Sequence, residues 1–255
     1  MEDKKIAVLI DSDNISSKYV RCICDELAKY GTATYKRIYG NWTDSHGEAW
    51  KKVLLDFAIT PVQQYNYTTG KNATDSAMII DAMDILYSGN VDGFCLVSSD
   101  SDFTRLAVRL REAGMLVIGM GEKKTPSPFI TACEKFIYLE MLLPEKPKTK
   151  KSTKKKKEDN VDQVQEKEPT KKEVTSKKEI VQALTDIIND VSADDGWAYL
   201  GDVFNILNKR YPDFDSRLYG FKKPSLFIRS LSEFVTEARA TKNSSADAIF
   251  VRIKG

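Results

Sequence analysis

Residues 7–14 read AVLIDSDN and residues 96–103 read LVSSDSDF, so each of two apolar runs leads into a pair of aspartates separated by one serine. Short unbroken apolar runs of this kind are typical of strands that are buried on both faces. Over the first 143 residues such runs alternate with segments of helical, amphipathic pattern. This alternation predicts an α/β domain in which helices cover both faces of a parallel sheet.

The same pattern places the individual elements of the chain. In the first domain we expect strands at 6–10, 34–39, 61–65, 93–97 and 115–120, a final apolar run at 136–143, and helices at 15–30, 48–59, 74–87, 103–113 and 128–132. Further along, the apolar spacing predicts helices at 179–191, 200–211 and 224–231 and a small hairpin formed by 234–238 and 248–253. The second domain is therefore expected to be small and mostly helical.

Residues 144–178 separate these two parts. They carry 13 Lys and Arg against seven Asp and Glu, and they contain three prolines and no aromatic residue. A segment of this composition buries too little apolar surface to offset the entropy that it would lose on ordering. We therefore expect domains at 1–143 and 179–255, joined by a flexible Lys-rich linker and without a fixed relative orientation.

The composition also narrows the class of protein. The four cysteines have no spacing that suggests a disulfide framework, and a single histidine leaves too few soft ligands for a closed zinc site. No apolar run approaches the roughly 18 residues that a membrane-spanning helix needs, and residues 1–10 lack the pattern of a secretory signal. The chain is expected to be cytoplasmic, with no contact to a membrane.

The acidic residues gather where strands end and helices begin. Asp11 and Asp13 follow the first strand, Asp100 and Asp102 follow the fourth, and Asp75 opens a helix, while a weaker acidic turn lies at 119–122. Ligands of open α/β sheets bind beyond the carboxyl ends of the strands. Two carboxylates about 5 Å apart repel by roughly 3 kcal/mol at an effective dielectric of about 20, so a cluster needs protonation or a cation. An all-oxygen site suits Mg²⁺ or Mn²⁺.

Helix capping is the simpler alternative for these aspartates. Asp and Asn favour N-cap positions, and Asn14, Asp75 and Asp102 each precede a segment of helical pattern. Capping needs one acid per helix, however, whereas paired aspartates follow two separate strands here. We therefore favour a metal site for the set as a whole.

Three segments carry a resemblance to a known family. Residues 7–15, 72–78 and 96–103 resemble, in that order, the motifs of the NYN domain family, relatives of the PIN-like ribonucleases, and the likeness extends over about residues 5–140. It implies a PIN-like fold, a divalent cation and hydrolysis of RNA phosphodiesters. The family's acidic positions are matched by Asp11, Asp75 and Asp100, which the resemblance implies as metal ligands, and Asp102 joins them as a catalytic residue. Asn14 matches a supporting position, as does Asp13, although many members have Glu or Gly there.

The second domain has a likeness of its own. Residues 197–201 (WAYLG), 219–226 (YGFKKPSL) and 231–234 (LSEF) are similar to the winged-helix domain called OST-HTH or LOTUS, over about residues 177–253. This family is associated with binding of RNA or of protein partners. The pairing of an NYN domain with a LOTUS domain is familiar, so each likeness supports the other.

Basic and aromatic residues suggest where RNA would be held. The candidates for RNA contacts are Lys71, Arg105, Lys222, Lys223 and Tyr219. Lysine and arginine bind phosphates and aromatic rings stack on bases, but solvated helix faces and core packing explain such residues equally well. A protein partner of the second domain and a homodimer also remain open.

The sequence thus favours a metal-dependent endoribonuclease with a tethered RNA-binding domain. One alternative is a haloacid-dehalogenase-type phosphatase, because Asp11-x-Asp13 follows the first strand, but Ile15 stands where that class has Thr or Val and Asp75 has no place in it. The other alternative is a catalytically silent adaptor that binds RNA or protein.

Overall fold

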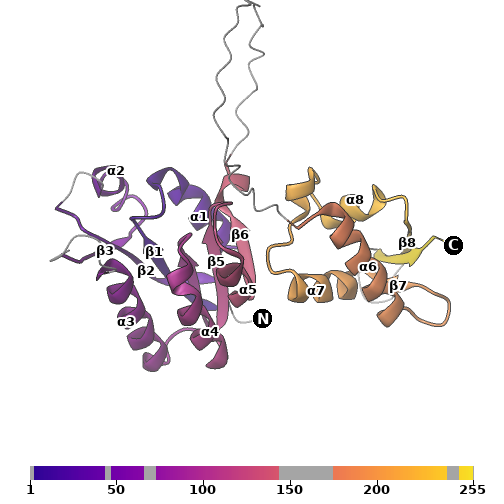
Figure 1. Ribbon diagram of the computed structural model, residues 1–255, viewed down its shortest axis with the longest axis horizontal. Helices are drawn as coiled ribbons and strands as arrows, with labels where there is room; N and C mark the ends of the chain where they lie inside the picture. The colour runs from indigo at the N-terminus through magenta and orange to yellow at the C-terminus, as the bar shows by residue number, and fades with distance from the viewer. Residues whose placement is uncertain (1–2, 44–46, 66–72, 144–174, 240–246, 255) are drawn as a thin grey trace, which may run out of the picture.

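The computed structural model describes residues 3–43, 47–65, 73–143, 175–239 and 247–254. It forms two domains, each with its own hydrophobic core (Figure 1). The predicted linker lies almost wholly outside the described residues. Within the described parts of the chain, none of the helices combines the length and the apolar character needed to cross a membrane.

The N-terminal domain is built on a six-stranded sheet in the order β3-β2-β1-β4-β5-β6. Every neighbouring pair is parallel, as the apolar runs predict. The strands are β1 (Lys5–Asp11), β2 (Thr32–Gly40), β3 (Thr60–Gln63), β4 (Gly93–Val97), β5 (Leu116–Gly121) and β6 (Lys135–Tyr138). Strand order reverses between β1 and β4, so the two aspartate-bearing segments leave the sheet side by side.

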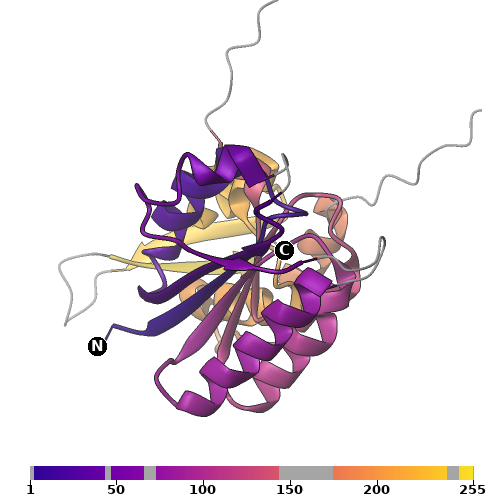
Figure 2. The ribbon, with the colours of Figure 1, turned by 90° about the vertical axis from the view of Figure 1, so that its left-hand side faces the viewer.

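Helices cover both faces of this sheet (Figure 2). The helical elements are η1 (Ser17–Tyr19), α1 (Val20–Leu27), α2 (Glu48–Lys51), α3 (Ala73–Ser88), η3 (Ser101–Phe103), α4 (Thr104–Glu112), α5 (Ser127–Ala132) and η4 (Leu139–Met141). Alternate residues of β1 serve two cores: Ala7 and Leu9 pack against α3, α4 and α5, whereas Val8 and Ile10 pack against α1 and the segment around Trp50. This double burial explains why the strand is apolar without interruption.

Two helices are shorter than the sequence predicts. Residues 15–30 form the turn η1 and the short helix α1, and residues 48–59 form only α2 followed by turns. Ala58 has a φ of 50°, a left-handed conformation that ends any helical continuation toward β3. Apolar spacing predicts which side chains are buried, but it does not distinguish a continuous helix from a series of turns that bury the same side chains.

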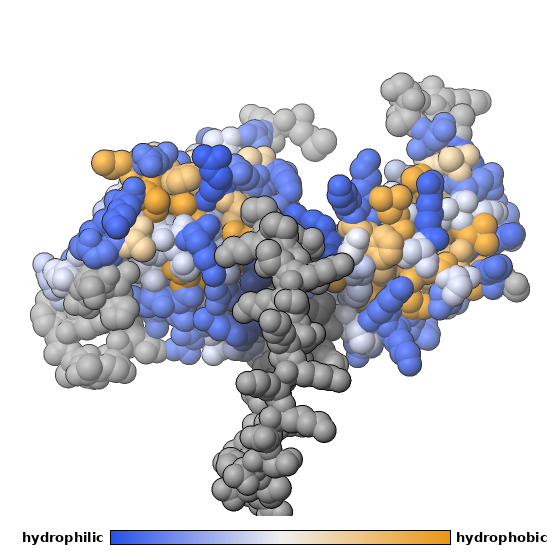
Figure 3. Space-filling model, turned by 90° about the horizontal axis from the view of Figure 1, so that it is seen from above, coloured by the Kyte–Doolittle hydropathy of each residue, from blue (hydrophilic) through white to orange (hydrophobic). Residues whose placement is uncertain are grey.

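The C-terminal domain is a helical unit with a three-stranded antiparallel sheet. It comprises α6 (Lys177–Val191), β7 (Ala198–Tyr199), α7 (Leu200–Arg210), η5 (Ser216–Tyr219), α8 (Pro224–Arg229), β8 (Phe234–Arg239) and β9 (Ala248–Ile253), with strand order β7-β9-β8. The predicted hairpin is confirmed as β8 and β9. Helix α6 begins at Lys177, two residues before the predicted start, because Ser176 and Glu179 form a capping box. Seen from the α8 side, apolar patches alternate with hydrophilic side chains (Figure 3).

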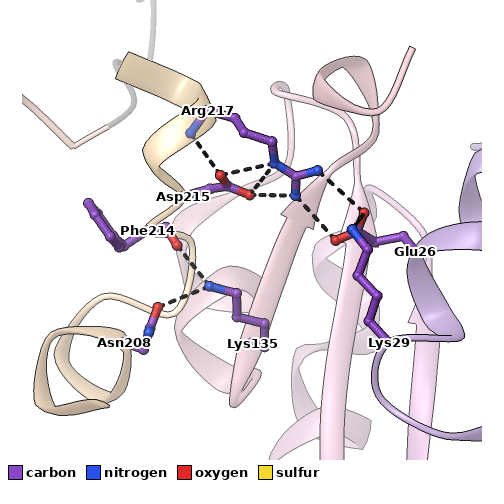
Figure 4. Close-up of polar contacts among 7 residues, drawn as sticks. All are labelled: Glu26, Lys29, Lys135, Asn208, Phe214, Asp215 and Arg217. Carbon is purple, nitrogen blue, oxygen red and sulfur yellow. Dashed lines mark hydrogen bonds and ion pairs between the residues drawn. The ribbon is translucent and has the colours of Figure 1, made fainter. Parts of the chain in front are cut away.

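The two domains are in contact, which contradicts the expectation that they have no fixed relative orientation. On the edge strand β6, the backbone N–H of Phe136 donates to the carbonyl of Pro212 at 2.9 Å. The Lys135 ammonium donates to the Phe214 carbonyl at 2.8 Å (Figure 4), and the Tyr138 hydroxyl donates to Asp213 at 2.9 Å. The C-terminal domain therefore covers the edge strand β6, whose unpaired backbone groups would otherwise be free to pair with another chain.

An ion network closes this interface (Figure 4). Arg217 pairs with Asp215 at 2.6 Å within its own domain and with Glu26 of α1 at 3.2 Å across the interface. Burial alone would raise the pKa of Glu26, but hydrogen bonds from Lys29 and Arg217 outweigh it and hold that pKa below its ordinary value. Glu26 therefore stays charged, and losing its arginine partner would leave this buried charge with Lys29 alone to compensate it.

We expect Arg217→Gln to loosen the contact between the domains. The variant keeps a hydrogen-bonding side chain but removes one of the two positive charges that compensate Glu26, the one that crosses the interface, so hydrogen exchange of the backbone amides in β6 should accelerate at least tenfold. The matched control is Arg210→Gln, because Arg210 pairs with Asp190 at 3.4 Å in an exposed position where such pairs contribute only about 0–1 kcal/mol. Unchanged exchange in β6 of the Arg217 variant would contradict a stable interface.

Candidate active site

The carboxyl ends of β1 and β4 form the centre of the candidate site. These strands are neighbours, with Ile10 in register with Val97, and the order of strands reverses between them. A crevice beyond such a switch point is where open α/β sheets bind ligands. Asp11 is the last residue of β1, and residues 98–100 follow β4 directly. The structure thus brings the carboxyl ends of these two strands together, as the apolar runs predict, while their role as a functional site stays a prediction.

Asp11 is fully buried and held by four hydrogen bonds. One carboxylate oxygen accepts from the backbone N–H groups of Asp13 at 3.0 Å and Asn14 at 3.4 Å. The other accepts from the Asn14 amide and from the Ser98 hydroxyl, each at 2.7 Å. Burial nevertheless raises the pKa of Asp11 above its ordinary value, since these hydrogen bonds only partly offset the loss of water. Its position is fixed in advance of any ligand.

Ser98 links the two acidic segments. Its hydroxyl donates to Asp11 and also accepts from the backbone N–H of Asp100 at 3.0 Å. Asp100 in turn accepts from the backbone N–H of Asp102 at 3.0 Å and so caps η3. The cap of η3 is therefore Asp100 and not Asp102, which the capping alternative names, and the second carboxylate oxygen of Asp100 accepts no hydrogen bond from another described residue. Capping and a ligand role are compatible in one side chain.

Asp75 shows that the acids form one electrostatic cluster. It lies in the first turn of α3. Burial raises its pKa to about 6, together with the negative charges of Asp11, Asp100, Asp102 and Asp13. The charges of four other predicted site residues therefore act on Asp75, although these five residues come from three separate segments.

The donor chemistry of this cluster fits a hard divalent cation, because every acidic group offers oxygen and repulsion among them is relieved by positive charge. In the conformation of the described residues, no three Asp, Glu, His or Cys side chains converge closely enough to form a metal site. The assignment of Asp11, Asp75 and Asp100 as ligands thus stays a prediction.

Helix α3 is anchored so that Asp75 faces this cluster. Asp81, farther along the helix, pairs with Arg37 and accepts from the Tyr39 hydroxyl, and both partners belong to β2. Tyr39 is in register with Asp11 on the neighbouring strand. The sequence contains no pattern that would have revealed these supporting contacts.

The loop after β5 is tied to the segment that follows β4. The Ser99 hydroxyl accepts from the backbone N–H of Glu122 at 2.8 Å, and Glu122 accepts from the Tyr19 hydroxyl at 3.3 Å. At Gly121 an added Cβ would lie 2.5 Å from the Ser98 carbonyl, so only glycine allows this approach. The weaker acidic turn at 119–122 therefore shapes the site, and Ser98 and Ser99 are functional candidates that sequence reasoning missed.

The remaining predicted residues are more scattered. Asn14 supports Asp11 as expected, and Asp13 is exposed beside it. Arg105 is exposed at the start of α4, close in sequence to Asp102. Lys71 lies outside the described residues.

The three C-terminal candidates belong to the other domain. Lys222 and Lys223 are exposed just before α8. Tyr219 packs its ring 5.0 Å from that of Phe227, and its hydroxyl donates to the Thr175 carbonyl at 2.8 Å. These contacts give Tyr219 a packing role in the core and leave the two lysines as the accessible groups.

Comparison with known proteins separates the two domains in the same way. The family model of the NYN domain matches residues 5–140, and that of the OST-HTH/LOTUS domain matches residues 175–245. A search of the curated proteins found no match. The match to the NYN domain favours the nuclease-type assignment of the acidic segments over the dehalogenase-type one.

Two solved structures are similar over parts of the chain. The crystal structure of a protein of unknown function from Vibrio parahaemolyticus is 20% identical, with a TM-score of 0.44, and the match covers 53% of this chain and 94% of the other. The solution structure of an uncharacterized protein from Nitrosomonas europaea is 35% identical over 39% of this chain and 92% of the other, with a TM-score of 0.27. Neither name states an activity. On the two family matches and the parallel fold, the chain belongs to the NYN domain family of PIN-like, ribonuclease-type domains and carries a C-terminal OST-HTH/LOTUS domain.

Proposed function

We propose that this protein is a divalent-metal-dependent endoribonuclease whose C-terminal domain contributes to RNA binding. The observation that carries the proposal is the gathering of Asp11, Asp75 and Asp100 at the switch point of the sheet, where burial and the neighbouring carboxylates raise the pKa of Asp75 to about 6. Perturbed acids that cluster at a sheet crevice are typical of functional sites. The ribonuclease-type character of the NYN family supplies the reaction class.

Asp11, Asp75 and Asp100 are the residues that would hold the metal, Mg²⁺ or Mn²⁺. When bound, such an ion polarises a phosphoryl oxygen and assists ionisation of the attacking water. Ser98 and Asn14 keep the Asp11 carboxylate oriented, and the cap on η3 does the same for Asp100. Asp102 and Asp13 add negative charge at the rim and thereby favour a cation.

RNA affinity would come from basic groups outside the acidic cluster. We propose Arg105 beside the site and Lys222 and Lys223 on the C-terminal domain as phosphate contacts, together with Lys71. Phosphates are the same at every position of an RNA, so these contacts would hold the substrate without reading its sequence. The contact between the two domains would hold the basic residues of the C-terminal domain in a defined position relative to the acidic cluster.

Incubation of the purified full chain with a circular single-stranded RNA tests the proposal. A circle has no ends, so only an endonuclease linearises it. We expect linear product with Mg²⁺ or Mn²⁺ and none with EDTA. Release of phosphate from a 5′-phosphorylated oligonucleotide without cutting would instead indicate a phosphatase, and RNA binding without any cutting would indicate a silent adaptor.

A further inference from the structure

The outer face of the small sheet carries an unusual set of side chains. In β9 the buried Val251 points into the core of the C-terminal domain, so its neighbours Phe250 and Arg252 lie on the opposite face. Tyr199 of β7 is in register with Phe250, and their ring centroids are 5.8 Å apart. Figure 1 places β7 and β8 at the end of this domain remote from the N-terminal domain, so the interface does not cover this face.

Arginines alternate with the rings on this face. The Arg239 guanidinium lies 4.6 Å from the centroid of the Phe250 ring and 5.0 Å from that of Trp197. The Arg252 guanidinium also lies 5.0 Å from the centroid of the Trp197 ring. The five side chains thus form a row in the order Arg252, Trp197, Arg239, Phe250 and Tyr199, which we call the wing array.

The wing array is accessible and held in place. Tyr199 is 46% exposed, and Arg252 is exposed as well. The Tyr199 ring packs against Gly201, where an added Cβ would lie 2.6 Å from it. Single exposed aromatics are common, but the core behind the sheet does not require three rings and two guanidinium groups in a row on the outer face.

We propose that the wing array binds single-stranded RNA by stacking of unpaired bases. Aromatic rings and the planar guanidinium of arginine both stack on bases, and this stacking tolerates any sequence. In a duplex the bases are already stacked and paired, so the array should prefer single strands. The inference rests on the proposed function only in taking RNA as the ligand. It adds a base-stacking surface on the sheet to the phosphate contacts proposed for Lys222 and Lys223.

The charges on this face indicate whether base stacking or attraction to phosphates supplies most of the binding free energy. Arg239 is paired with Asp195 at 3.7 Å and with Glu237 at 3.4 Å, so much of its positive charge is compensated. These acids orient the guanidinium but reduce attraction to phosphates. Stacking should therefore supply most of the affinity of this face, and replacing Tyr199 should weaken binding without changing its salt dependence, which follows phosphate contacts.

The test uses the full chain with Asp100→Asn, in metal-free buffer, so that the RNA stays intact. Fluorescence anisotropy measures binding of a labelled 12-nucleotide oligouridylate, alone or paired with oligoadenylate. Tyr199→Ser should weaken binding of the single strand at least fivefold, the effect of losing one stacked base. Tyr199→Phe, which keeps the ring, should stay within twofold of the parent, and the duplex should bind more weakly than the single strand.

Arg229→Gln is the matched charge control, because Arg229 is exposed on α8 outside the array. Trp197→Leu provides a second array variant, and circular dichroism confirms that each variant is folded. Unchanged binding of the single strand by the folded Tyr199→Ser and Trp197→Leu variants would overturn the proposal. It would favour a protein partner as the ligand of this face. Because binding is measured without metal, a failure of the cleavage assay would not affect this result.

Discussion

Asp100→Asn is expected to slow RNA cleavage at least about a hundredfold, which corresponds to roughly 2.7 kcal/mol of activation free energy. The amide removes one negative charge from the cluster that raises the pKa of Asp75. It still offers an oxygen to the backbone N–H of Asp102, so the cap on η3 should survive. The loss should therefore arise from chemistry at the site and not from unfolding.

The paired measurement is single-turnover cleavage and equilibrium binding on the same RNA. Binding should change by less than about threefold, because Lys and Arg contacts to phosphates lie outside the cluster. Asp84→Asn is the matched control, since Asp84 is an exposed acid on the same helix as Asp75. Cleavage by the Asp100 variant at the wild-type rate would show that this site is not the nuclease centre.

Point variants suit this question better than deletion of residues 144–255. Deletion would strip the edge strand β6 of its hydrogen bond from Phe136 to Pro212 and would leave Lys135 without the Phe214 carbonyl. Burial lowers the pKa of Lys135, and deletion of the second domain would also remove Asn208, its other hydrogen-bond acceptor. Loss of activity after deletion would therefore mix the loss of RNA binding with damage to the sheet.

The location of the acidic site was predictable because local patterns determine it. Apolar runs that stop at Ile10 and Val97 mark the carboxyl ends of two strands, and parallel strands bring those ends to one edge. The helix that carries Asp75 has a long, strongly apolar repeat. For all three segments, information within about ten residues is enough to place the acid.

The supporting contacts were not predictable for the opposite reason. Ser98 and Ser99 look like ordinary loop residues, and their roles depend on Asp11 and Glu122, which are distant in sequence. The interface was missed because the composition of the linker says nothing about complementary surfaces elsewhere. Glu26 and Arg217 are 191 residues apart, and neither carries a local signal that it will be buried.

Asp75→Asn is expected to lower cleavage at least about a hundredfold and, at the same time, to stabilise the metal-free protein. The folded pKa of Asp75 is about 6, above its ordinary value of 3.8. The native state therefore binds a proton more tightly than the unfolded state, and stability from this group is lost as pH rises from about 4 to 6. Above pH 6 the ionised carboxylate opposes folding, and asparagine removes that penalty.

The measurement is thermal unfolding in EDTA at pH 7.5 and at pH 4.5. At pH 7.5 the variant should melt roughly 2–4 °C above the wild type, the shift that about 1 kcal/mol produces in a chain of this size. At pH 4.5 the gain should largely vanish, because Asp75 is then protonated in the native wild type. Asp84→Asn should show no such pH-dependent gain.

Mn²⁺ should reverse the order of stability at pH 7.5. A cation that binds the native cluster stabilises the wild type by mass action and relieves the repulsion among its carboxylates. The variant has lost a predicted ligand, so its melting temperature should respond little to the metal. Equal stabilisation of both proteins by Mn²⁺ would exclude Asp75 as a ligand. A wild type whose melting temperature Mn²⁺ leaves unchanged would show that this cluster does not bind the metal. Because this readout needs no substrate, it tests the site separately from the identity of the RNA.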